Sequence, residues 1–265
     1  MEAQSPRHVN ELFAIPGRIA LVTGGSRGLG LQIAEALGEA GAAVVLTARR
    51  ADELDSACRA LASRGITAHA IAGDAADAED IARVCRSTLE VHGHIDILVN
   101  NAGASWGAPA EEHPLASWDK VMNLNVRGVF VYSQTVARLC MIPRRAGRIV
   151  MVASIAGLAG NPPGLETVAY NTSKAAVLNM TRALAGEWGE HGITVNALAP
   201  GWFPSRMTAA TLQAKGEQFL ARVPLRRFGN DEDLKGAALL LASDAGRHIT
   251  GQVLAVDGGT SAIQG

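Results

Sequence analysis

The stretch TGGSRGLG, residues 23–30, decides how the chain folds. It follows an apolar, β-rich run, RIALVT (18–23), and leads directly into a stretch of helical pattern. Its glycines are spaced G-x-x-x-G-x-G. Gly24 permits a tight turn, Gly28 lets a phosphate group approach the backbone, and Gly30 lets the helix pack on the strand. Because the first helical amides then point at the loop, this strand–loop–helix unit predicts a site for the pyrophosphate of a dinucleotide.

The same alternation of strand and helix continues along the chain. Seven short apolar runs predict strands at 18–23, 42–47, 67–72, 95–100, 147–153, 193–199 and 252–257. Helical patterns lie between them at 28–40, 51–64, 77–92, 117–141, 168–189 and 231–242. Strands that are apolar without strict alternation are typical of a sheet covered on both faces. The order predicts an α/β fold: a single-domain, doubly wound parallel sheet of the Rossmann type, with about seven strands and helices on both faces.

The composition sets further limits on domains and partners. The chain has 265 residues, of which 48% are hydrophobic and 18% charged, and its formal net charge is −1. It can therefore bury a substantial core, and it lacks the basic surface expected of a nucleic-acid-binding protein. No linker or composition break is visible. We expect residues 1–12 to form a mobile N-terminal arm and residues 13–265 a single dinucleotide-binding catalytic domain.

The cysteines and the apolar runs of the sequence indicate whether metal sites, disulfides or membrane segments are expected. The three cysteines, Cys58, Cys85 and Cys140, are far apart and form no CxxC motif. This pattern indicates neither a disulfide framework nor a metal site. No apolar run approaches the ~18 residues that span a bilayer, and the first residues lack a hydrophobic signal core. We therefore expect a cytoplasmic protein with no membrane partner.

The end of the second predicted strand indicates which dinucleotide is bound. An acidic side chain there would bind the ribose 2′-hydroxyl of NAD, but residues 47–50, TARR, contain none. Arg49 and Arg50, with Arg27 of the glycine loop, instead favour a 2′-phosphate, because a guanidinium matches phosphate oxygens. The cofactor expected is NADP(H) rather than NAD(H). The alternatives are that both arginines are solvated residues opening a helix, or that a bend returns Asp52 or Glu53 to the ribose.

Other strand ends extend this predicted cofactor site. Asp74, after the third strand, is placed to accept a hydrogen bond from the adenine amino group, and NNAG (100–103) follows the fourth strand. The residues expected at the cofactor are Gly24, Ser26, Arg27, Gly28, Leu29, Gly30, Arg49, Arg50, Asp74, Asn101, Ala102, Gly103, Tyr170, Lys174, Pro200 and Gly201.

Several motifs in order along the chain resemble those of the classical short-chain dehydrogenase/reductase family. They are TGGSRGLG (23–30), NNAG (100–103), NLNVRG (123–128), Ser154, YNTSK (170–174), APG (199–201) and TGQVLAVDGG (250–259). The resemblance covers about residues 17–260. It implies a catalytic tetrad of Asn125, Ser154, Tyr170 and Lys174, with Asn125 distorting its helix. It also implies a homotetramer, with helices 117–141 and 168–189 at one interface. The apolar C-terminal strand and the tail GGTSAIQG (258–265) suit a second interface.

The spacing of Tyr170 and Lys174 supports acid–base chemistry. Residues four apart lie on one face of a helix. A neighbouring ammonium is expected to lower the pKa of a tyrosine, which is ordinarily about 10. Tyr170 would then donate a proton to a ketone during reduction and accept one from an alcohol during oxidation. Ser154 would hold the same substrate oxygen, and Lys174 would also bind the nicotinamide ribose.

The substrate remains open between two classes. We expect Trp106, Asn161, Trp202 and Phe203 in the substrate pocket, and a lid at GWFPSRM (201–207). An apolar lid favours a 3-oxoacyl-type carbonyl reductase. The segment before Tyr170 also resembles a branch similar to gluconate 5-dehydrogenase, which acts on sugar acids. For that substrate, Arg206 is the nearby candidate cation. A non-catalytic dinucleotide sensor is a third possibility, and it would predict a broken tetrad.

Overall fold

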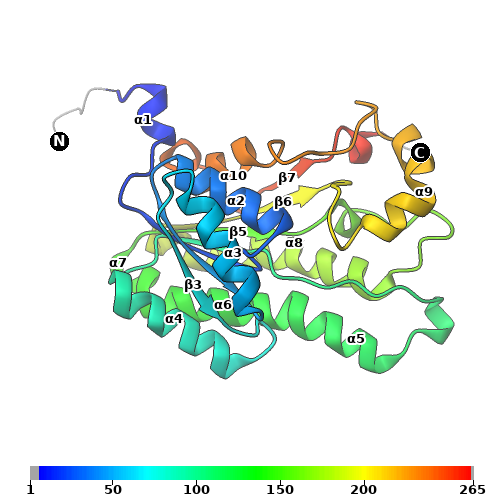
Figure 1. Ribbon diagram of the computed structural model, residues 1–265, viewed down its shortest axis with the longest axis horizontal. Helices are drawn as coiled ribbons and strands as arrows, with labels where there is room; N and C mark the ends of the chain where they lie inside the picture. The colour runs from blue at the N-terminus through cyan, green and yellow to red at the C-terminus, as the bar shows by residue number, and fades with distance from the viewer. Residues whose placement is uncertain (1–5, 264–265) are drawn as a thin grey trace.

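A computed structural model describes residues 6–263 and contains the predicted parallel sheet (Figure 1). Its strands are β1 (Ile19–Thr23), β2 (Ala43–Ala48), β3 (Ala68–Ala72), β4 (Ile97–Asn100), β5 (Gly147–Val152), β6 (Ile193–Pro200) and β7 (Val253–Val256). The order in the sheet is β3-β2-β1-β4-β5-β6-β7, and every neighbouring pair is parallel. The doubly wound fold is therefore confirmed. The strand order reverses between β1 and β4, which is where such sheets open a crevice for ligands.

Helices cover both faces of this sheet (Figure 1). They are α1 (Val9–Phe13), α2 (Gly28–Glu39), α3 (Ala51–Ala62), α4 (Ala78–His92), α5 (Leu115–Met122), α6 (Val129–Val136), α7 (Ile142–Arg144), α8 (Val168–Trp188), α9 (Ala209–Ala221) and α10 (Lys235–Ala242). Alternate residues of β1 point to opposite faces, as the two-residue period of a strand requires. Ala20 and Val22 pack with α2, α3 and α10, whereas Ile19 and Leu21 pack with α4, α6 and α8.

Burial differs between the centre and the edges of the sheet. All residues of β1, β4 and β6 are buried. In β3 and β7, at the two edges, no residue is fully buried. The expectation that the strands are covered on both faces therefore holds for β1, β4 and β6. It does not hold for β3 and β7, which lie at the edges of the sheet and are more exposed to solvent.

The helix expected over 117–141 is a series of shorter segments. A π-helical turn, η2 (Asn123–Gly128), joins α5 to α6, and a second one, η3 (Ala137–Met141), joins α6 to α7. π-helical turns widen a helix locally and are frequent at functional sites. The first of them contains Asn125, at the position where the family resemblance implies a distorted helix.

Apart from α7, which continues the helix predicted over 117–141 by three residues, two helices lie where none was predicted. α9 has few large apolar side chains, and Phe219 is its one buried residue, so its sequence carries little of the apolar stripe that identifies a helix. α1 lies within the expected N-terminal arm, and next to it Arg7 pairs with Asp244 at 2.9 Å. The mobility of residues 1–12 stays a prediction, and residues 1–5 lie outside the described part of the chain.

Two kinds of feature are absent from residues 6–263. No helix there combines the length and the apolar character needed to cross a membrane. Within the same range, no group of three or more His, Cys, Asp or Glu side chains is arranged to hold a metal ion.

A close contact in the π-helical turn generates a stability prediction. A Cβ atom on Gly128 would overlap the carbonyl oxygen of Ala75. Gly128→Ala is expected to destabilise the fold by about 1–3 kcal/mol, as overpacking does, measured by urea denaturation.

The matched control is Gly186→Ala, since a Cβ there meets no atom within 4 Å and Gly186 lies inside α8. The control is expected to raise stability by up to about 1 kcal/mol, the usual difference in helix propensity. Equal stability of the two variants would contradict the predicted contact.

Candidate active site

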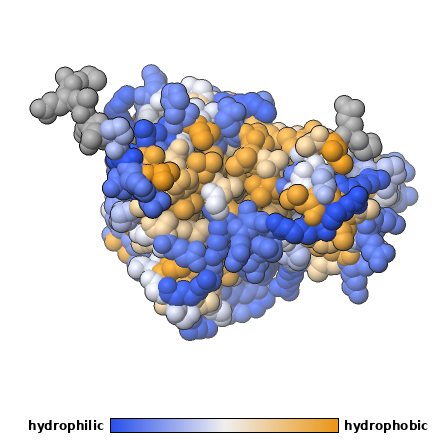
Figure 2. Space-filling view, turned by 90° about the horizontal axis from the view of Figure 1, so that it is seen from above, coloured by the Kyte–Doolittle hydropathy of each residue, from blue (hydrophilic) through white to orange (hydrophobic). Residues whose placement is uncertain are grey.

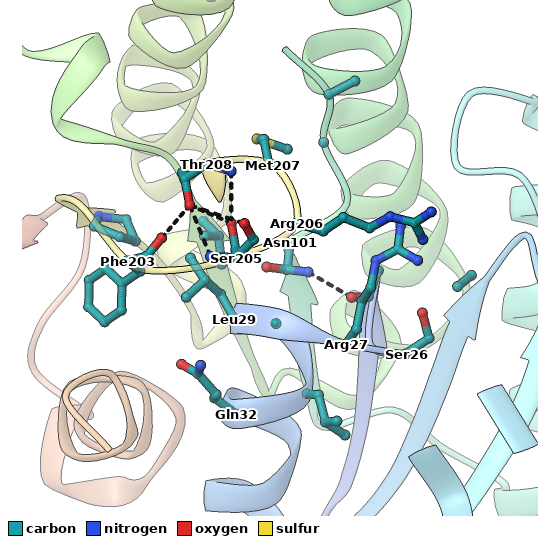
Figure 3. Close-up of a pocket in the computed structure, with 18 of the residues that line it drawn as sticks. Ser26, Arg27, Leu29, Gln32, Asn101, Phe203, Ser205, Arg206, Met207 and Thr208 are labelled. Carbon is teal, nitrogen blue, oxygen red and sulfur yellow. Dashed lines mark hydrogen bonds between the residues drawn. The ribbon is translucent and has the colours of Figure 1, made fainter. Parts of the chain in front are cut away.

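A cleft of about 890 Å³ opens at the carboxyl ends of the strands. The glycine loop, the end of β2 and the loop after β4 line one part of it. The end of β5, the first turns of α8 and the 200–208 loop line the rest (Figure 3). Ser154, Tyr170 and Lys174 therefore share one cavity with the glycine loop, although they are far from it in sequence.

The glycine loop has the geometry expected for a phosphate site. Gly24 and Gly28 adopt positive φ angles of 63° and 55°, which favour glycine. α2 begins at Gly28 and no side chain caps its first turn, so the first amides of the helix are free to bind an anion. Gly30 has a different role, because a Cβ there would overlap the Asn101 amide and the Gly24 carbonyl oxygen. It allows close packing and lies outside the lining of the cleft.

The loop after β4 is attached to the glycine loop by side-chain hydrogen bonds. The amide of Asn101 donates to the carbonyl oxygens of Thr23 and Gly24, at 2.9 and 3.0 Å. The Thr23 hydroxyl accepts from the backbone amides of Asn101 and Ala102, at 3.0 Å each. Thr23 was not among the expected site residues. Its position at the start of TGGSRGLG was the available signal, because a hydroxyl at the carboxyl end of a strand can bond to the loop that follows the neighbouring strand.

The proposed catalytic side chains meet where β5 ends and α8 begins. Ser154 directly follows Ala153 at this end, and its Oγ accepts a hydrogen bond from the amide of Ala156 at 3.1 Å. Lys174 is buried, and its Nζ donates to the carbonyl oxygen of Val152 at 2.8 Å. The same Nζ lies 5.6 Å from the centre of the half-buried Tyr170 ring. The ammonium is thus beside the tyrosine, as the four-residue spacing predicts, but a backbone carbonyl holds it.

Burial governs the ionisation of both groups. It raises the pKa of Tyr170, and a hydrogen bond with Ser154 acts in the opposite direction. Burial lowers the pKa of Lys174 to about 8. The expected lowering of the Tyr170 pKa by Lys174 is therefore not found in the protein alone. The physical reason is that removal from water disfavours the phenolate and the ammonium alike.

Asn125 is fully buried and lies behind the cleft wall. Its Oδ1 accepts from the amide of Ala104 at 2.8 Å. Its Nδ2 donates to the carbonyl oxygen of Ala104 at 2.9 Å and to the Ser173 hydroxyl at 3.0 Å. Ser173 in turn donates to the carbonyl oxygen of Tyr170 at 2.7 Å. Ser173 was not expected at the site, although it lies within the YNTSK motif.

A network of charges occupies the other end of the cleft. Arg27 and Arg50 lie there as expected, and both pair with Glu53, Arg50 at 3.3 Å. Arg50 also binds Asp52 at 2.6 Å. A bend that returns Glu53 to the ribose was the alternative to the arginine site considered from the sequence. The first turn of α3 does bring Glu53 to the glycine loop, where its Oε2 lies 3.5 Å from the Ser26 hydroxyl.

The remaining expected cofactor residues are distributed as follows. Those that line the cleft are Ser26, Leu29, Arg49, Asp74, Asn101, Gly103, Pro200 and Gly201. Ala102 lies behind the lining, against Gly24. Asp74 Oδ1 accepts a hydrogen bond from the amide of Ala76 at 2.9 Å. One carboxylate oxygen of Asp74 therefore already stabilises the turn that contains it. The roles of these residues stay predictions.

The expected substrate residues are only partly at the cleft. Phe203 lines it and is also part of the core around α2 and α10. Trp202 points the other way and stacks on Phe219 of α9, with ring centres 4.2 Å apart. Asn161 donates to Leu165 and Thr167 within its own loop, and Trp106 is 47% exposed. Trp106, Asn161 and Trp202 are thus not part of the cleft lining. Asn161 is held by its own loop, and Trp202 by its stack on α9.

The 200–208 loop forms a compact turn over the cleft, which we call the lid. The Thr208 hydroxyl donates to the Phe203 carbonyl oxygen at 2.7 Å and accepts from the Ser205 amide at 2.9 Å (Figure 3). Met207 and Arg206 project from this turn into the cleft lining. Arg206 reaches towards Arg27, and its Nη1 lies 3.5 Å from Glu53 (Figure 3).

These residues fit a bound dinucleotide. The cleft lies at the reversal of strand order, the first amides of α2 have no side-chain cap, and the arginines face the end where an adenosine ribose would lie. Lys174 faces the opposite end beside Tyr170. The donor set therefore suits a molecule with a central pyrophosphate and two ribose groups.

Known proteins resemble this chain over almost its whole length. A family profile described as enoyl-(acyl carrier protein) reductase matches residues 24–261. The gluconate 5-dehydrogenase of Gluconobacter oxydans is 42% identical over 253 residues, covering 94% of this chain and 96% of that protein. The rhamnolipids biosynthesis 3-oxoacyl-[acyl-carrier-protein] reductase of Pseudomonas aeruginosa is 42% identical over 257 residues, covering 93% and 97%.

A solved structure agrees with these relatives. The gluconate 5-dehydrogenase of Burkholderia cenocepacia, in complex with NADP and tartrate, superimposes with a TM-score of 0.92. It is 35% identical and covers 97% of this chain and 100% of its own. Together with the fold and the grouping of Ser154, Tyr170 and Lys174, these similarities show that the chain belongs to the short-chain dehydrogenase/reductase family.

Proposed function

We propose that the protein is an NADP(H)-dependent oxidoreductase that interconverts a ketone and a secondary alcohol, acting as a 3-oxoacyl-type carbonyl reductase. One observation carries this proposal: Ser154, Tyr170 and Lys174 line the same cleft as the glycine loop. A non-catalytic sensor would have no need for this arrangement. All four expected catalytic residues are present, and hydrogen bonds through Ser173 connect Asn125 to the backbone of Tyr170.

The cofactor, when bound, supplies or accepts the hydride. The amides at the start of α2 would hold its pyrophosphate, and Lys174 its nicotinamide ribose. Arg27, Arg49 and Arg50 would face the 2′-phosphate. Their preference for NADP(H) is supported by the Burkholderia cenocepacia relative, which is described as a complex with NADP.

The proton transfer is assigned to Tyr170. In reduction its hydroxyl donates a proton to the carbonyl oxygen of the substrate. Because burial raises its pKa, Tyr170 is protonated at neutral pH and ready for this step. Ser154 is placed to hold the same oxygen, and a fixed donor there stabilises the charge that develops on it. Lys174 contributes a positive charge beside the ring.

The wall near Tyr170 favours an apolar substrate. Ala104, Leu124, Ala153 and Met207 line the cleft, together with Ser105 and Ser205 of the neighbouring positions. Burial of an acyl chain against such a wall is favourable by about 0.8 kcal/mol per methylene. The exposed side chain of Trp106 follows Ser105, which lines the cleft.

A sugar-acid dehydrogenase is the second candidate. It is favoured by the relative from Gluconobacter oxydans, which is named a gluconate 5-dehydrogenase. A sugar acid requires a cation at the catalytic end of the cleft. Arg206, the cation considered for this purpose, pairs instead with Glu53 at the other end, which favours the 3-oxoacyl alternative.

A homotetramer in the cytoplasm, expected from the sequence, remains part of this proposal. Figure 2 shows apolar side chains gathered along the face on which α10 and β7 run in Figure 1. β7 is an edge strand, and its Leu254 is 37% exposed. Phe130 of α6 and Val168 of α8 are likewise exposed on the helices expected at the other interface. A second copy would cover such surfaces.

Removal of the proposed proton donor gives a direct test. Tyr170→Phe is expected to lower kcat for ketone reduction by about 10²–10⁴-fold, the usual contribution of general acid catalysis. The dissociation constant for NADPH, measured by fluorescence titration, should change by no more than about twofold, since phenylalanine keeps the packing of the ring. Turnover close to that of the unmodified protein would rule out Tyr170 as the donor.

The lowered pKa of Lys174 predicts a pH dependence of cofactor capture. Lys174 is charged below pH 8 and neutral above it, since its pKa is about 8. The kcat/KM for NADPH reports groups of the free protein. It should therefore be constant below about pH 8 and fall above it, as the ammonium that binds the ribose is lost. Lys174→Met should have a low kcat/KM for NADPH at every pH, with no step near pH 8. A step of equal size in that variant would assign the titration to another group.

The dependence of kcat/KM on the length of the substrate's acyl chain distinguishes the two substrate classes. With 3-oxoacyl thioesters, kcat/KM should rise by up to about fourfold for each added methylene, the equivalent of about 0.8 kcal/mol. 5-Ketogluconate should be a poor substrate. Met207→Ser should reduce the dependence on chain length, and Met141→Ser, which alters a fully buried methionine outside the cleft, serves as a control for general destabilisation. A preference for 5-ketogluconate would favour the sugar-acid alternative.

A further inference from the structure

Three arginines converge on one carboxylate at the ribose end of the cleft. Arg27 pairs with Oε2 of Glu53, and Arg50 and Arg206 lie 3.3 and 3.5 Å from its Oε1. We call Arg27, Arg50, Arg206 and Glu53 the guanidinium cluster. All four residues line the cleft.

The members of the cluster come from separate parts of the fold. Arg27 is in the glycine loop, Arg50 follows β2, and Glu53 lies in the first turn of α3. Arg206 belongs to the lid, and its extended side chain crosses the cleft to reach the others (Figure 3). The ion pair between Arg206 and Glu53 thus connects the lid, which borders the substrate, to the wall that faces the adenosine ribose.

Charge and exposure suggest what the cluster binds. The Glu53 side chain is only 20% exposed, whereas the side chains of Arg27, Arg50 and Arg206 are 52%, 58% and 71% exposed. The carboxylate lies beneath the cations, and their donor groups face the cleft. Even with Asp52 bound to Arg50, three guanidiniums face two carboxylates. Positive charge is therefore in excess where a second anion can enter.

We propose that Glu53 is an internal stand-in for the 2′-phosphate, and that Arg206 transfers from Glu53 to this phosphate when NADP(H) binds. This inference rests on the cofactor preference in the proposed function. A phosphate carries more charge and more acceptor oxygens than a carboxylate, so it competes well for guanidiniums. The pair between Arg206 and Glu53 is long and its arginine is exposed, and such pairs are weak. It can therefore exchange partners without a large cost.

Two consequences follow for specificity. Glu53 opposes the phosphorylated cofactor, because it repels the phosphate and occupies its donors. It does not oppose a cofactor with a free 2′-hydroxyl, which a carboxylate can bind. Arg206 favours the phosphorylated cofactor and closes the lid over it. Glu53 and Arg206 are thus specificity-determining residues with opposite effects.

Binding of two nucleotide fragments tests this inference without any turnover. 2′,5′-ADP carries the 2′-phosphate, and 5′-AMP lacks it. Isothermal titration calorimetry on the full chain should show that Glu53→Gln binds 2′,5′-ADP about three- to tenfold more tightly, a change of up to about 1.4 kcal/mol. Arg206→Gln should bind it about three- to tenfold more weakly. Both variants should bind 5′-AMP no more tightly than the unmodified protein.

Asp55→Asn is the matched control. Asp55 lies on the same helix as Glu53 and is exposed, so its removal changes the net charge equally. It lines no part of the cleft. Both fragments should bind this variant within about twofold of the unmodified protein, because exposed charges at a distance are screened by salt.

The rate of tryptic cleavage after Arg206, followed by mass spectrometry, reports whether the lid is held in place. Saturating 2′,5′-ADP should slow this cleavage at least about fivefold more than saturating 5′-AMP, because only the phosphate draws Arg206 into a bound state. Equal protection by the two fragments would contradict the transfer of Arg206.

The outcomes separate this inference from the proposed function. If the unmodified protein binds 5′-AMP as tightly as 2′,5′-ADP, the proposed preference for NADP(H) is wrong. If it prefers 2′,5′-ADP but Glu53→Gln weakens that binding, Glu53 only positions the arginines, and the stand-in role is wrong. If Arg206→Gln binds both fragments normally, the lid does not take part in recognising the phosphate.

Discussion

The hydrogen bonds of the Asn125 carboxamide hold together the segments on which the site depends. They connect the loop after β4, the π-helical turn and α8 through Ala104 and Ser173. A buried amide must satisfy its donors and acceptors, and here each of the Asn125 polar atoms has a partner. The helix accommodates this by widening at η2 instead of running straight through. The geometry around Tyr170 is therefore a property of the fold and not of one side chain.

The cations at the two ends of the cleft differ in burial and in the partners that hold them. Lys174 is buried and bonded to a backbone carbonyl, so its position is fixed and its charge is costly. The guanidinium cluster is exposed, and its cations share acidic partners that can be exchanged. A fixed cation suits chemistry that needs one orientation. Exchangeable cations suit the recognition of an anion that arrives from solution.

Much of the fold could be predicted from the sequence because its signals are local. The apolar runs located all seven strands, and the glycine loop located the crevice, since strand, turn and helix are contiguous there. The spacing of Tyr170 and Lys174 correctly placed both on one face of α8. Other features had no local signal. α9 buries only Phe219, and the turn of α3 that brings Glu53 to Ser26 depends on tertiary packing. The pairing of Arg206 with Glu53 joins distant parts of the chain, and the orientation of Trp202 is set by α9.

α9, which borders the opening of the cleft, is attached to the rest of the fold by few contacts. Phe219 is the one buried residue of this helix, and it stacks on Trp202 of the lid. Lys215 adds a hydrogen bond to the carbonyl oxygen of Gly164, on the loop across the opening. Segments with so few buried contacts open locally at far lower free energy than a core sheet. The amides of α9 can thus exchange with solvent hydrogen in a protein whose β1, β4 and β6 amides remain protected, and substrates can enter while the rest of the fold stays intact.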